Sequence, residues 1–317
     1  MDGLPLLEHL VLEGAIVKDG DTMGSVTRRV EMGHLTHIEL HEWIYVVQCA
    51  GLLDHLILPA CRTLALMGTN SAMRTAKECH RVFFAVVSAL GDRSALRACE
   101  LRLLVGSVAV YLWQDTLPAF KYDDYRRGTD EDDDPSGRPQ VTVRVGCGGT
   151  VIRSDVLPIL VSALPLADVR TLRLLQANRG HSVRPLASLR NVETLLYLCD
   201  RPTELLQTLS KFQHDPRTLL LFPALRHLTL RQAQWRPNWR RSVERDSDVP
   251  LSELIDGMLL ARGEMGAPLH ELRLQGLRNL DVAEELGWLE SARQDVSHFQ
   301  WDTEDWGEEY WFRWLNH

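Results

Sequence analysis

The sequence predicts an α/β solenoid, with a curved parallel sheet on one face and helices and loops on the other. Three observations predict it. A short apolar pattern recurs along the 317 residues, helix-like segments separate several of its copies, and apolar residues make up 45% of the chain. A single copy could not bury its apolar side, so the copies must stack on one another. We therefore expect one irregular leucine-rich-repeat domain over residues 1–317, with roughly nine or ten repeats.

The repeated pattern is L-x-x-L-x-L, in which other apolar residues replace some leucines. Its last two apolar positions are two residues apart, so they point to the same side of a strand, and the residue between them faces outward. The copies are Leu7-Leu10-Leu12, Leu35-Ile38-Leu40, Leu53-Leu56-Leu58, Cys61-Leu64-Leu66, Leu96-Cys99-Leu101, Val169-Leu172-Leu174, Leu225-Leu228-Leu230, Leu269-Leu272-Leu274, Val296-Phe299-Trp301 and, more weakly, Leu189-Val192-Leu195. The outward row would run through Val11, Glu39, Ile57, Ala65, Glu100, Arg173, Thr229, Arg273 and Gln300.

Three segments between the copies predict helices. Ser71–Leu90 carries an apolar stripe at helical spacing, and Leu157–Leu166 and Leu251–Leu260 are shorter candidates. The last of these follows Asp248-Val249-Pro250, which is typical of a helix start. Alternation of strands and helices indicates a parallel sheet covered on one side.

Three other segments interrupt the repeats. Residues 121–140 contain the acidic run Asp130–Asp134 and predict a flexible insertion, as does 234–250 with its mixture of tryptophan and arginine. Residues 303–317 are acidic and aromatic, so they predict either a cap on the last repeat or a partner-binding tail.

Composition excludes several classes of function. The net charge of −8 and the pI near 5.8 argue against general affinity for nucleic acid or anionic membrane. The most apolar window, Ile44–Met67, is interrupted by charged residues and does not predict a membrane span. None of the six cysteines has C-x-x-C spacing, so we expect reduced thiols and an intracellular protein, cytoplasmic or nuclear.

No catalytic motif is found, and we expect a protein that is not an enzyme and needs no cofactor or metal. His34, His37 and His41 are close in sequence, but ordinary polar positions on a strand face explain them better than a metal site. The Gly146–Thr150 segment could cradle a phosphate as a glycine-rich turn, although it lacks the spacing of nucleotide-binding loops. A nucleotide or small-molecule binder centred there remains an alternative.

The outward side of the sheet is the predicted binding site for a partner protein. Its acidic residues lie in the N-terminal half and its arginines in the C-terminal half, which favours a partner of complementary, split polarity. The candidate residues are Glu13, His37, Glu39, His41, Glu100, Arg173, Thr229, Arg231, Arg273, Gln275 and Gln300.

Several repeats resemble the leucine-rich-repeat region of fungal F-box proteins. The resemblance is carried by Leu52–Pro59, Phe222–Leu230, Pro268–Leu274 and the closing Val296–Asp302. It implies a substrate-recognition domain of an SCF-type ubiquitin ligase adaptor, whose partner protein is a substrate for ubiquitination. A Skp-type adaptor is implied as a partner only where an F-box precedes the repeats, and this chain opens directly in a repeat at Leu4–Leu7. The alternative is a stand-alone or decoy repeat protein without ligase coupling.

Overall fold

The computed structural model describes most of the chain in two compact units, residues 1–171 and 172–317. The described residues are 6–14, 29–41, 46–73, 75–91, 96–104, 107–114, 140–147, 156–176, 182–199, 201–210, 221–235, 249–278, 280 and 282–302. The expected acidic insertion, apart from Gln140, and the expected tail at 303–317 lie outside them. A single domain over the whole chain stays a prediction.

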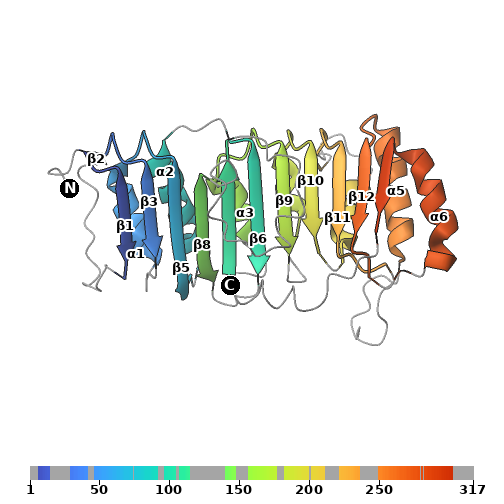
Figure 1. Cartoon of the computed structure of the whole chain (residues 1–317), viewed down its shortest axis with the longest axis horizontal. Coiled ribbons are helices and arrows are strands. Elements are labelled where there is room, and N and C mark those ends of the chain that lie inside the picture. The colour runs from blue at the N-terminus through green and yellow to red at the C-terminus, as the bar shows by residue number, and fades with distance from the viewer. Residues whose placement is uncertain are drawn as a thin grey trace. The chain divides into compact units, whose positions relative to one another are not determined.

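The first unit contains a mostly parallel sheet, seen on the N-terminal side of Figure 1. Strands β1, β3, β5 and β8 run parallel to one another, and β7 runs antiparallel to its neighbours β8 and β6. In spatial order the described strands are β1 (His9–Glu13), β3 (His37–His41), β5 (Thr63–Met73), β8 (Val141–Cys147), β7 (Ser107–Trp113) and β6 (Ala98–Leu104).

Helices α1 (Val46–Asp54), α2 (Ala76–Leu90) and α3 (Val156–Ala163) lie behind this sheet in Figure 1. A capping box begins α2: the Thr75 hydroxyl accepts from the Glu78 backbone N–H, and the Glu78 carboxylate accepts from the Thr75 N–H. The helix ends at Gly91, whose φ of 71° favours glycine. Helix α2 thus begins later than the predicted Ser71, because residues 71–73 belong to β5.

The second unit repeats a strand followed by a helix or turn. Its elements are β9 (Thr171–Gln176, whose first residue ends the first unit), the 3₁₀-helix η2 (Arg184–Ser188), β10 (Thr194–Leu198), α4 (Thr203–Ser210), β11 (His227–Arg231), α5 (Leu251–Glu264), β12 (Glu271–Gln275), α6 (Val282–Asp295) and β13 (His298–Trp301). The strands lie in sequence order, and β10 to β13 are parallel. The predicted α/β class with a mostly parallel sheet is confirmed, as are the helices at α3 and α5.

One backbone hydrogen-bond pattern recurs at the start of the strands. In several copies, the backbone carbonyl of the residue after the first apolar position accepts two hydrogen bonds. The donors are two consecutive backbone N–H groups at the start of the neighbouring strand. The Glu8 carbonyl accepts from Thr36 and His37 at 2.8 and 3.1 Å, and the Glu193 carbonyl accepts from Arg226 and His227 at 2.8 and 3.0 Å. The carbonyls of Thr36, Arg97 and Arg226 do the same for Arg62 and Thr63, Arg170 and Thr171, and His270 and Glu271. The repeated sequence spacing therefore corresponds to a repeated structural step.

Two predicted copies of the pattern are corrected by the structure. Leu53 lies in α1, and β4 (Leu56–Ile57) pairs with β2 (Val30–Glu31) in a separate two-stranded sheet, so Ile57 is not part of the predicted row. The weak copy near residue 190 is shifted in register. Its apolar positions are Val192, Leu195 and Tyr197, which are all buried. The register follows from Glu193, whose carbonyl accepts the paired hydrogen bonds that the residue after the first apolar position accepts in other copies.

Two predicted loop segments contain ordered residues. Trp235, placed in an insertion by its sequence, is fully buried and packs edge-on against Trp288 at 4.9 Å, while Gln234 forms a β-bridge with Arg278. Gly146 and Cys147, expected in a turn, end strand β8. Residues 148–150 and 236–248 lie outside the described residues.

Candidate interaction surface

The outward side chains of β11, β12 and β13 form a polar surface that we call the unit 2 face. The strand registers align them in rows across the sheet: His227 with Glu271 and His298, Thr229 with Arg273 and Gln300, and Arg231 with Gln275. On the opposite side of β11 and β12, the leucines of each repeat are buried. Burial of these leucines fixes the register, because a shift by one residue would expose them. The polar residues are therefore held in place by the core beneath them.

A hydrogen-bonded cluster is centred on Glu271 in this surface. Its Oε1 accepts from the Arg273 Nε at 2.7 Å, and its Oε2 lies 3.1 Å from the Nδ1 of His227. A second guanidinium nitrogen of Arg273 lies 2.6 Å from the same Oε1. Burial works to raise the Glu271 pKa, but the hydrogen bonds and charges of Arg273 and His227 outweigh it and hold the pKa below its usual value. Glu271 is thus ionised at neutral pH and orients both neighbours.

This lowered pKa links the cluster to stability. A carboxyl group whose pKa is lower in the folded state stabilises the fold above its unfolded pKa, and the contribution is lost as the pH falls through the folded value. The Glu271 cluster therefore contributes at neutral pH and weakens in acid, as the pH falls below the usual pKa of a glutamate side chain. The Arg273 side chain remains 42% exposed, so it can still meet a partner.

Three imidazole rings lie side by side at the start of the same strands. The ring centroids of His227 and His270 are 5.8 Å apart, and those of His270 and His298 are 4.8 Å apart, each pair edge to face. His270 and His298 are exposed, and His227 is half-buried. The sequence prediction missed these histidines and Glu271. A signal was available for His227, Glu271 and His298, which continue the outward positions at a spacing of two residues from Thr229, Arg273 and Gln300, but not for His270, which lies outside this alternation.

The structure divides the predicted partner-binding residues between the two units. In the first unit, Glu13 on β1 is exposed and in register with His41, and His37, Glu39 and His41 share one half-buried side of β3. His41 Nε2 lies 3.0 Å from Glu39 Oε2, and His37 stacks on His9 at 4.4 Å. In the second unit, Thr229, Arg231, Arg273 and Gln275 are half-buried and Gln300 is exposed.

Two predicted residues are buried rather than exposed. Glu100 on β6 is 1% exposed and forms an ion pair with Arg102, whose guanidinium lies 4.5 Å from the Tyr111 ring centre. Arg173 on β9 is 9% exposed. Neither side chain is accessible in the way that the alternating pattern predicted, because both sides of these strands are largely buried. The accessible part of the predicted row therefore lies on β1, β3 and β11 to β13.

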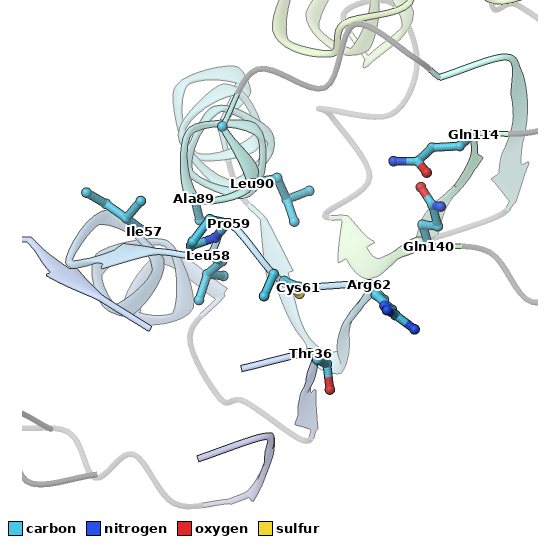
Figure 2. A pocket seen from close by; sticks show the side chains of 12 residues that line it. Thr36, Ile57, Leu58, Pro59, Cys61, Arg62, Ala89, Leu90, Gln114 and Gln140 are labelled. Atoms are coloured by element: carbon cyan, nitrogen blue, oxygen red, sulfur yellow. The ribbon is translucent and has the colours of Figure 1, made fainter. Parts of the chain in front are cut away.

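An open pocket of about 640 Å³ lies elsewhere, in the first unit (Figure 2). Leu58, Pro59 and Leu90 form its apolar side, while Gln114 and Gln140 lie together across from them with Arg62 nearby. The Gln140 Oε1 is buried without a hydrogen-bond partner among the described residues. No residue of the predicted partner-binding set lines the pocket.

Cys49 and Cys99 are buried in the first unit. Burial raises the pKa of the Cys49 and Cys99 thiols far above its usual value, which keeps them protonated and poorly nucleophilic. Within the described ranges, no group of three histidine, cysteine or acidic side chains is arranged to hold a metal ion. None of the helices described combines the length and apolar character needed to cross a membrane.

Comparison with known proteins gives no relative: no protein-family model, curated protein or solved structure matches the chain.

Proposed function

We propose that the chain is a leucine-rich-repeat protein that recognises another protein through the unit 2 face. The observation that carries this proposal is the in-register rows of partly exposed polar side chains on β11, β12 and β13, above a leucine core. Such rigid, repeated surfaces are suited to binding extended partners, because the backbone is already ordered before binding. The recurring hydrogen-bond pattern at the strand starts supports the repeat assignment.

The partner is best described by the groups that the face offers. Arg273 and Gln300 lie in one row with Thr229, so guanidinium, amide and hydroxyl groups can all donate hydrogen bonds to a partner. Half-exposed polar side chains around a rigid centre are typical of protein interfaces, where arginine is enriched. A substrate protein presented for ubiquitination, as the F-box resemblance implies, would meet this surface; without an upstream F-box, the same surface would serve a stand-alone interaction protein.

The proposal is tested by charge reversal on the face and on the helix side. The full chain is used to capture proteins from a lysate as wild type, as Arg273→Glu and as Arg293→Glu, and captured proteins are quantified by mass spectrometry. Arg293 is exposed near the end of α6 and gives a matched control. A true partner is retained by wild type and by Arg293→Glu and depleted roughly tenfold or more by Arg273→Glu. Equal retention by all three folded proteins would refute recognition through this face.

A further inference from the structure

The three clustered histidines lie beside charged groups of both signs. Glu271 contacts His227 and Arg273 directly. Glu193 and Arg226 adjoin the histidines through the backbone, because the Glu193 carbonyl accepts from the His227 N–H and the Arg226 carbonyl accepts from the His270 N–H. The charges of Glu271 and Arg273 offset each other, so protonated histidines would give this part of the surface a positive charge.

Imidazole side chains as a class change charge between about pH 5 and pH 8. Three rings with centroids 4.8 and 5.8 Å apart would carry like charges at close range once protonated. An anionic ligand relieves that repulsion. The favourable electrostatic contribution to its binding free energy is largest where the like charges are closest. The two exposed rings, those of His270 and His298, can reach such a ligand directly.

We propose that His227, His270 and His298 bind an acidic segment of the partner protein, and that this binding tightens as the pH falls from 8 to 6. The inference rests on the proposed function and names the partner's chemistry and its regulation. Aspartate and glutamate side chains remain ionised over this range, so the change of charge lies on the histidine side of the interface. Glu271 directs the ring of His227 through its contact with Nδ1.

The test uses the full chain and a fluorescent aspartate-rich peptide, titrated at pH 8.0 and pH 6.0 in constant salt. The variant His270→Gln/His298→Gln removes the two exposed rings. Its matched control is His34→Gln/His80→Gln, which replaces two exposed histidines of the first unit. We expect wild type and control to bind roughly tenfold more tightly at pH 6.0 than at pH 8.0, and the His270/His298 variant to lose most of that gain.

Three results would overturn the inference: no peptide binding at pH 6.0, a gain that survives in the His270/His298 variant, or a gain that the control variant loses equally. Circular dichroism at both pH values shows that each variant is folded. The proposed function fails separately, because it is judged by capture at one pH with Arg273→Glu. A partner that depends on Arg273 but binds equally at pH 8.0 and 6.0 would leave recognition by the face intact and refute the histidine mechanism.

Discussion

At the scale of single residues, Arg262 shows how a buried charge can organise a turn. Its side chain is fully buried on α5 and donates to the carbonyls of Phe222 at 3.3 Å and Leu225 at 3.0 Å. Phe222 has a φ of 50°, an uncommon conformation for a residue other than glycine. Burial lowers the pKa of Arg262 to about 10, so the guanidinium is still charged at neutral pH. The arginine therefore supplies a donor to the Leu225 carbonyl and a further donor to the Phe222 carbonyl, which also accepts from the Leu225 N–H.

Replacement of Arg262 by methionine should destabilise the protein. Methionine fills much of the volume but donates no hydrogen bond, so buried carbonyls lose this donor, while relief of the buried charge offsets part of this loss. We expect the free energy of unfolding to fall by about 3 kcal/mol, measured by urea denaturation with tryptophan fluorescence. Arg293→Met, at an exposed site, should change it by less than about 0.5 kcal/mol. Equal stability of the two variants would show that the carbonyls do not need this donor.

At the scale of elements, helix α2 shows how local sequence sets a boundary. The capping box of Thr75 and Glu78 satisfies N–H groups at the start of the helix, and Cys79, Val82 and Phe83 pack into the core. The apolar stripe alone predicted an earlier start, since residues 71–73 can also be read as helix. Their place in β5 depends on pairing with β8, a strand separated from β5 by more than 60 residues. Periodicity in one segment carries no information on such a distant partner.

Removal of the Thr75 hydroxyl should weaken this helix start. We expect Thr75→Ala to lower the free energy of unfolding by about 1 kcal/mol, because the Glu78 N–H loses its acceptor. Thr75→Ser keeps the hydroxyl and should stay within a few tenths of a kcal/mol of wild type. Denaturant titration by circular dichroism measures both. A loss in Thr75→Ser as large as that in Thr75→Ala would point to the methyl group rather than the cap.

The strands were predictable where burial on one side imposes alternation, and less so where both sides are covered. On β11 and β12 the leucines alternate with half-buried polar residues, and sequence spacing predicted strand and outward face together. On β6, Glu100 is buried like its leucine neighbours, and its strand pairs antiparallel with β7, which the repeat pattern did not predict. The histidine cluster depends on register between three strands, which the sequence of one strand cannot reveal.

At the scale of the whole molecule, the repeated step appears in both compact units, although their local layout differs. The first unit includes the antiparallel strand β7, whereas β10 to β13 in the second are all parallel. Under the proposed repeat assignment, each step contacts mainly its neighbours, so stability is distributed along the chain rather than concentrated in one core. The effect of a core substitution should then decline with distance along the strand order.

Hydrogen–deuterium exchange on the full chain tests this expectation. Leu228 on β11 is fully buried, so Leu228→Ala creates a cavity that should cost about 2–5 kcal/mol locally. We expect faster exchange in β10, β11 and β12, which pair directly with one another, and little change in β3 and β5 of the first unit. The reciprocal variant Leu40→Ala, in the buried side of β3, should affect β1 and β5 and spare β11. Uniform acceleration over both units in either variant would mean that residues 1–317 unfold as one cooperative domain.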